Sequence, residues 1–121
     1  MFVSNFLTRY HSVFKDRHQV IKHLSEQDDM DVYVLHYGDF TPHVSSVYNK
    51  VHKYKVNSSL TKSNIIKLVT QIRKEEFDKV VFCEIGMDSF AKYLALYRLA
   101  PQQYNTWGHS DTSGHEHIDY F

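Results

Sequence analysis

The polar loop at residues 107–114 carries the residue types in this chain that are best suited to bind a ligand. It reads Trp-Gly-His-Ser-Asp-Thr-Ser-Gly and follows residues 102–106, which have the character of a short strand. In open α/β sheets ligands bind at the carboxyl ends of strands, where this loop would begin. Glycine allows close backbone approach to a ligand, and the hydroxyl groups can donate or accept hydrogen bonds. The candidate binding residues are Gly108, His109, Thr112, Ser113 and Gly114.

Histidines in the same region suggest a second chemistry. His109, His115 and His117 lie close together with acidic residues among them. A strand over residues 115–117 would point both of its rings to one face, and histidine and carboxylate groups are zinc ligands. The segment has neither a CxxC nor an HExxH frame. A His-rich metal-binding domain is therefore the alternative, and we predict no metal.

Strands and helices alternate along the chain. We predict strands at residues 1–6, 31–37, 52–56, 80–83 and 102–106, and helices at residues 12–24, 41–50, 61–76 and 89–99. The clearest helix is 61–76, because its apolar residues recur at positions i, i+3, i+4 and i+7. Ser12 and Asp88 are the expected N-caps of their helices, and Pro101 prevents the helix at 89–99 from continuing.

This alternation predicts an α/β fold: a Rossmann-like parallel sheet with helices on both faces. The G-x-G-x-x-G fingerprint is absent, so NAD binding is not indicated. With 121 residues, the chain forms one domain, residues 1–121, with no internal repeat.

Composition excludes several classes of protein. Hydrophobic residues make up 42% of the chain, which is typical of a globular domain. Lys plus Arg and Asp plus Glu number 14 each, so charge favours neither nucleic acid nor an anionic membrane as a partner. No apolar run approaches the ~20 residues that span a bilayer, and the first residues do not resemble a signal peptide. We expect a soluble, cytoplasmic protein in which the single cysteine, Cys83, packs in the core.

The last third of the chain also carries an ordered motif. Arg98-Leu-Ala-Pro101 is followed by Trp-Gly-His at 107–109, Thr-Ser-Gly at 112–114 and Ile-Asp-Tyr at 118–120. This order resembles R-x-A-P-x-Q-x-x-W-x-G-x-P-x-T-S-G-x-x-x-x-D-Y of the catalytic domain of O-GlcNAc transferases and SPINDLY proteins. Phe-Val-Ser-Asn at 2–5, followed by His11, resembles the first strand and the histidine-bearing loop of that domain.

The resemblance implies a function. Family members have two Rossmann-like lobes in the GT-B arrangement, and this chain resembles the N-terminal lobe, so we expect a fragment or truncated relative that lacks the C-terminal lobe. The activity implied is transfer of GlcNAc or a hexose from a nucleotide sugar, such as UDP-GlcNAc, to protein, without a metal or other cofactor. His11 would be the catalytic residue that orients the acceptor or moves its proton. The 107–114 loop would contact the donor sugar.

The partners implied are a nucleotide sugar, a protein acceptor and a C-terminal lobe, in cis or in trans. Apolar surface left uncovered by the absence of that lobe predicts self-association. We also expect the isolated chain to show no transferase activity. A non-catalytic binding module or a gene remnant of the same family is the alternative.

Departures from the motif and simpler explanations oppose the functional assignment. Ser110 replaces a proline and Asp111 replaces a common glycine, and an acid would repel a diphosphate unless it is paired. A lysine that many relatives carry after the residue matching Gly86 is missing. Gly108 and Gly114 are also explained as turn glycines, and His11 as a surface histidine.

Overall fold

A computed structural model describes residues 1–7, 11–36, 51–56, 61–106 and 114–121. These form a five-stranded parallel sheet in the order β3-β2-β1-β4-β5. The strands are β1 (Phe2–Val3), β2 (Tyr33–His36), β3 (His52–Lys55), β4 (Lys79–Phe82) and β5 (Gln102–Asn105). The helices are α1 (Ser12–Ser25), α3 (Lys62–Lys74) and α4 (Ser89–Leu94), with a 3-10 turn at Ile85–Met87. The helix predicted at 41–50 lies outside the described residues.

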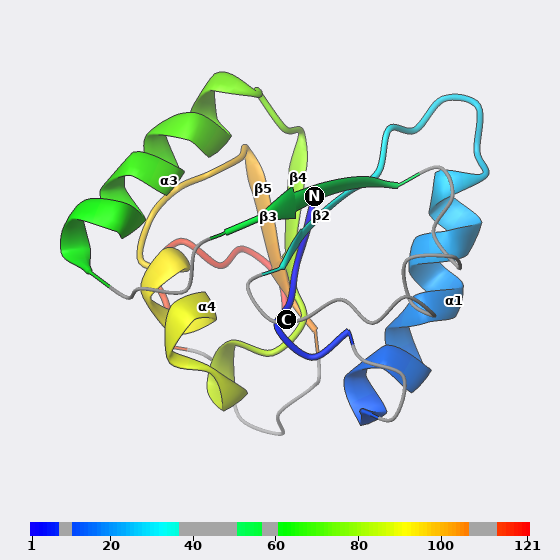
Figure 1. The fold of residues 1–121 in the computed structure, drawn as a ribbon, viewed down its shortest axis with the longest axis horizontal. Coiled ribbons are helices and arrows are strands. Elements are labelled where there is room, and N and C mark those ends of the chain that lie inside the picture. The colour runs from blue at the N-terminus through cyan, green and yellow to red at the C-terminus, as the bar shows by residue number, and fades with distance from the viewer. Residues whose placement is uncertain (8–10, 37–50, 57–60, 107–113) are drawn as a thin grey trace.

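Helices cover both faces of the sheet, as predicted. In Figure 1, α3 and α4 lie on one side and α1 lies on the other. Alternation along the strands explains the two cores. Phe2 pairs with Val34, and both pack with the apolar residues of α1. Val3 pairs with Leu35 and Phe82, and all three pack with α3 and α4.

Local sequence explains where two of the helices begin. Thr61 caps α3, since its side chain accepts a hydrogen bond from the Asn64 amide at 3.3 Å. The apolar stripe of α3 is buried, namely Ile65, Leu68, Val69 and Ile72. Asp88 caps α4 as predicted, through a hydrogen bond from the Ala91 amide at 2.9 Å.

The fourth helix is shorter than predicted, because α4 ends at Leu94 rather than at residue 99. The buried side chain of Gln103 explains the difference. Its amide group bonds to the backbone of Tyr97, Leu99 and Ala100, which holds these residues in a non-helical path. A polar side chain that satisfies backbone groups in this way competes with helix formation.

Cys83 is fully buried in the core on the α1 side, as predicted. Burial raises the pKa of its thiol. Among the described residues, no helix is both long and apolar enough to cross a bilayer.

Candidate functional site

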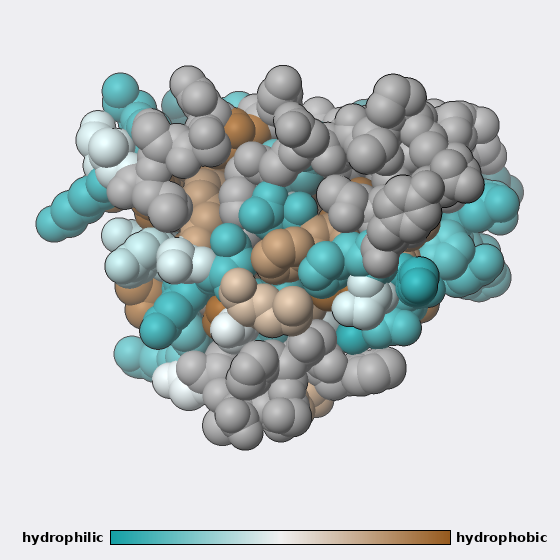
Figure 2. Space-filling model, turned by 60° about the horizontal axis from the view of Figure 1, so that its bottom comes forward, coloured by the Kyte–Doolittle hydropathy of each residue, from teal (hydrophilic) through white to brown (hydrophobic). Residues whose placement is uncertain are grey.

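The sheet has a topological switch point between β1 and β4. The chain moves outward from β1 to β2 and β3, and then returns to β4 on the other side of β1. Helices therefore leave neighbouring strands toward opposite faces, and open α/β sheets bind their ligands at the carboxyl ends of strands at such a point. In Figure 1 these ends point toward the bottom of the molecule, where α1 and α4 begin. Figure 2 turns this end forward, and hydrophilic and hydrophobic residues lie next to one another on it.

A buried carboxyl group lies at this switch point. Glu84 follows β4 and has no exposed surface. Its Oε2 accepts a hydrogen bond from the Ser4 hydroxyl at 2.7 Å, and its Oε1 accepts one from the Asn5 amide. The pKa of Glu84 is raised to about 7 overall, and burial is the largest cause. The hydrogen bonds from Ser4 and Asn5 oppose this increase, and the charge of Asp88 adds a smaller one. The carboxyl group thus joins the end of β4 to the loop after β1.

His11 also lies at this end of the sheet. Its backbone is extended (φ −82°, ψ 143°), and its Nδ1 accepts a hydrogen bond from the Val13 amide at 3.2 Å. His11 is therefore the N-cap of α1, and the prediction that Ser12 is the cap was wrong. The imidazole stacks on the ring of Phe6, with 4.5 Å between centroids and 14° between planes. Because Nδ1 is an acceptor, the ring proton lies on Nε2, the nitrogen that is left for a ligand.

An arginine links α1 to the end of β5. Arg17 is 8% exposed, and its Nε donates a hydrogen bond to Thr106 Oγ1 at 3.1 Å. The Thr106 hydroxyl in turn donates to the carbonyl of Cys83 at 3.2 Å. Next to it, Asn105 Oδ1 is buried and makes no hydrogen bond to the described residues. The polar groups at the ends of β1, β4 and β5 therefore belong to one edge of the sheet.

Most of the predicted ligand loop lies outside the described residues, namely Gly108, His109, Thr112 and Ser113. Gly114 is described, and its φ of +64° is favourable only for glycine. Apart from Gly114 itself and its chain neighbours, no heavy atom of the described residues lies within 4 Å of the position that a Cβ would occupy there. Its backbone conformation, rather than a close contact, explains the glycine.

The alternative of a metal site required a strand over residues 115–117. His117 lies in a turn instead, and His109 lies outside the described residues. His115 bonds through Nε2 to the carbonyl of Lys92 at 3.0 Å. The described part of the chain contains no group of three or more metal-ligating side chains.

The motif around Pro101 forms a clasp of hydrogen bonds and one ion pair. Gln103 donates through Nε2 to the carbonyl of His117 at 2.9 Å and through its backbone amide to Asp119 at 2.8 Å. Asp119 also pairs with Arg98. These motif residues fix residues 117–119 against β5. Tyr120 stacks on Tyr104, with 4.8 Å between ring centroids, and is half exposed.

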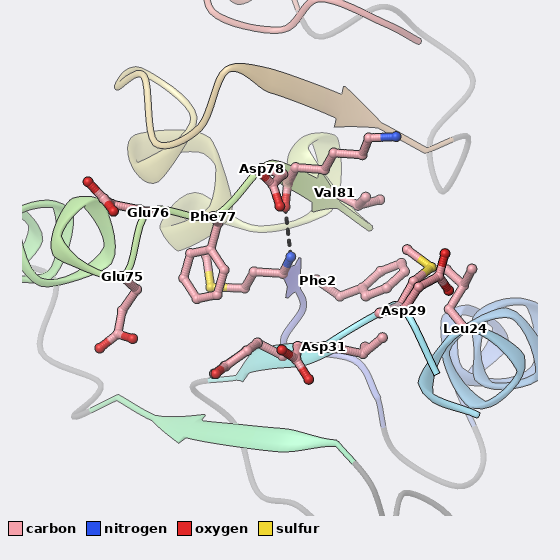
Figure 3. A pocket seen from close by; sticks show the side chains of 14 residues that line it. Phe2, Leu24, Asp29, Asp31, Glu75, Glu76, Phe77, Asp78 and Val81 are labelled. Carbon is pink, nitrogen blue, oxygen red and sulfur yellow. Dashed lines mark hydrogen bonds between the residues drawn. The ribbon is translucent and has the colours of Figure 1, made fainter. Parts of the chain in front are cut away.

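A pocket of about 400 Å³ lies at the opposite, amino-terminal end of the strands. Figure 3 shows acidic side chains around it. The Met1 amine donates a hydrogen bond to the Lys79 carbonyl at 2.7 Å. The acidic residues that line it are Asp29, Asp31, Glu75, Glu76 and Asp78. It is remote from the switch point, and none of the predicted site residues lines it.

Comparison with known proteins identifies the fold. No family model and no curated protein matches the sequence. A solved structure of a mutant O-GlcNAc transferase from Thermobaculum terrenum matches 98% of this chain, with a TM-score of 0.76 and 21% identity. The chain has the fold of part of an O-GlcNAc transferase. It spans 22% of the length of that structure.

The comparison confirms the predicted resemblance to O-GlcNAc transferases at the level of fold. At 21% identity it does not test the predicted roles of His11 or the 107–114 loop. Sequence reasoning missed Glu84 and Arg17 altogether. The available signal for Glu84 was an acid directly after an apolar run that was predicted to be a buried strand, since acids are rarely buried unless they are paired.

Proposed function

We propose that this chain is the acceptor-side lobe of a glycosyltransferase that moves a sugar from a nucleotide sugar to protein. The observation that carries the proposal is the likeness to an O-GlcNAc transferase over 98% of the chain. The polar edge at the switch point supports it, because this is where an open α/β sheet binds its ligand.

Glycosyl transfer makes three demands on a site. The acceptor hydroxyl must be positioned and must lose its proton. The negative charge of the leaving diphosphate must be stabilised, for which backbone N–H groups suffice without a metal. Water must be excluded, because it would hydrolyse the donor. A single open edge of a sheet does not exclude water, so the proposed enzyme needs a second lobe, in cis or in trans.

His11 is the residue proposed to act on the acceptor. Its Nδ1 is occupied by the Val13 amide, so Nε2 would orient the acceptor hydroxyl or exchange a proton with it. The donor sugar would lie against Gly108, His109, Thr112, Ser113 and Gly114. The donor would be UDP-GlcNAc or a UDP-hexose.

An NMR titration of the labelled chain with UDP-GlcNAc and with UDP tests the proposal. We expect shifts at His11 and across residues 107–114, and larger shifts with the complete donor than with UDP. A titration of the His11→Asn variant is the control for the role of the imidazole. An absence of shifts at millimolar ligand would contradict a donor site on this chain.

The alternative is a non-catalytic binding module with the same fold, which the small share of the enzyme that is matched supports. We expect the isolated chain to show no sugar transfer under either proposal. An in-frame coding sequence for a second α/β lobe after Phe121 would favour the enzyme, and transfer by the longer product would establish it. Binding of a protein ligand with no response to nucleotide sugars would favour the module.

A further inference from the structure

The loop between β1 and α1 is joined to β4 by a continuous series of contacts that ends at His11. The Glu84 carboxyl group accepts from the Ser4 hydroxyl at 2.7 Å and from the Asn5 amide. Ser4 Oγ then accepts a hydrogen bond from the Phe6 amide at 3.1 Å. The Phe6 ring stacks on the imidazole of His11 at 4.5 Å. Each contact restrains the position of the next residue in the series, from Glu84 to His11.

The parts of this series differ in burial. Ser4 and Glu84 have no exposed surface, whereas Phe6 and His11 are half-buried. The polar pair at its base is therefore shielded from water, and a hydrogen bond in such surroundings is stronger than the same bond in water. The stacked rings keep part of their surface exposed among the described residues.

Ordinary stability does not explain an acid at position 84. A carboxyl group without exposed surface costs free energy to bury, and an apolar side chain of similar size would avoid that cost. The acid instead supplies two acceptors that a hydrocarbon lacks. Both acceptors are used by the short segment between β1 and the histidine loop.

We propose that Glu84 is a positioning residue that holds the loop after β1, and through Ser4 and Phe6 sets the orientation of the His11 imidazole. The value of this arrangement for catalysis rests on the proposed function, but the geometry does not. Glu84 does not touch the ligand in this proposal. It acts only through the loop.

Amide exchange and histidine NMR on the full chain test the proposal directly. We compare the natural chain with Glu84→Gln and Glu84→Ala. In Glu84→Ala, exchange of the Asn5 and Phe6 amides should accelerate by about tenfold or more, as expected when a buried hydrogen bond is lost. The His11 ring should lose its single Nε2-protonated state and give averaged ring signals. Glu84→Gln keeps one acceptor, so it should restore the Asn5 amide and part of the His11 signature.

Two further variants separate positioning from a general loss of stability. Ser4→Ala removes the middle of the series with a small change in volume, and should alter the Phe6 amide and the His11 ring even where Glu84→Ala fails to fold. Gln103→Ala removes another fully buried polar side chain, in β5, and should leave the His11 signals unchanged. Unchanged His11 signals in folded Glu84→Ala and Ser4→Ala would overturn the proposal.

The outcome is independent of ligand binding. If the His11 signature changes in these variants and the natural chain binds no nucleotide sugar, the proposed function fails while the positioning role stands. If the natural chain binds UDP-GlcNAc and the His11 ring signals do not change in the Glu84 variants, only the positioning role fails.

Discussion

Arg98 and Asp119 form a bidentate ion pair that joins the segment after residue 113 to the segment before β5. Arg98 Nη1 lies 2.6 Å from Asp119 Oδ2, and Nη2 lies 3.0 Å from Oδ1. Asp119 Oδ2 also accepts from the Gln103 amide at 2.8 Å. The hydrogen bond from Arg98 lowers the pKa of Asp119, and the backbone bond from Gln103 lowers it further. Both sides of the 107–113 segment are thus held to the same strand.

Replacing Arg98 should loosen this clasp. Lysine cannot reproduce the planar fork of arginine, so we expect Arg98→Lys to increase amide exchange at Gln103, Asp119 and Tyr120. The effect on the free energy of unfolding should be small, because both side chains reach solvent. Hydrogen exchange followed by NMR measures the local effect.

Asp119→Asn is the matched control for charge. It retains an acceptor for the Gln103 amide but loses the ion pair, so exchange at Gln103 should be intermediate. Because the pKa of Asp119 is lowered in the folded chain, the contribution of the carboxylate to stability is present above its unfolded pKa and disappears as pH falls through the folded value. Exchange in Asp119→Asn should therefore lose this acid dependence. Equal exchange in all three chains would contradict the clasp.

Stability should fall as pH rises from about 5 to about 8 because of Glu84. Burial raises the pKa of this carboxyl group from 4.5 to about 7 in the folded chain, so the folded state binds more protons than the unfolded state in this range. Its contribution is greatest below about 4.5 and is lost as pH rises through 7. The loss is of the order of 3 kcal/mol if the unfolded group titrates normally.

Chemical denaturation of the natural chain and Glu84→Gln at several pH values measures this contribution. Glutamine does not titrate, so the difference between the two free energies of unfolding should change across the pH range with the sign given above. Asp88→Asn is the control, since the Asp88 charge raises the pKa of Glu84 and its removal should move the transition to lower pH. A difference that does not vary with pH would mean that Glu84 titrates as an exposed acid.

The sequence alone was sufficient for the layers of this fold but not for the order of its strands. Alternating short apolar strands and amphipathic helices are local patterns, so the parallel sheet and its two covered faces follow from them. The ends of elements were less accurate where a distant side chain decides them. Gln103 ends α4 early through contacts that helical periodicity does not contain.

The candidate site was less predictable for the same reason. Glu84 takes its character from Ser4 and Asn5, which lie about eighty residues away in sequence. Only the return of the chain from β3 to β4 brings these residues together. His11, by contrast, lies in a recognisable loop, and the structure adds the cap and the stacking that fix its ring.

Glu76 occupies a backbone conformation that favours glycine, at the C-terminal end of α3. Its φ is +53°, whereas Glu75 before it is right-handed with a φ of −76°. Left-handed geometry is common after a helix but is strained for a side chain with a Cβ. We expect Glu76→Gly to raise the free energy of unfolding by up to about 1 kcal/mol, as measured by denaturation.

Glu75→Gly is the control, because it removes the same charge at the C-cap of α3, where the backbone is right-handed. It should instead lower the free energy of unfolding by up to about 1 kcal/mol. The opposite signs of the two changes distinguish backbone strain from relief of acidic repulsion near the pocket. Stabilisation by both variants would point to repulsion.

The contribution of His11 as a helix cap can be separated from its stacking on Phe6. Asparagine is a strong N-cap and alanine is not, while neither has a ring to stack. His11→Asn should therefore be more stable than His11→Ala by about 1 kcal/mol, and both should be less stable than the natural chain. Ser12→Ala tests the other candidate cap. The side chain of Ser12 is outside the cap contact and alanine has the higher helix propensity, so the variant should change the free energy of unfolding by no more than a few tenths of a kcal/mol. A larger decrease in the free energy of unfolding in Ser12→Ala than in His11→Ala would mean that Ser12 is the N-cap. The His11 imidazole would then not be held by the Val13 amide.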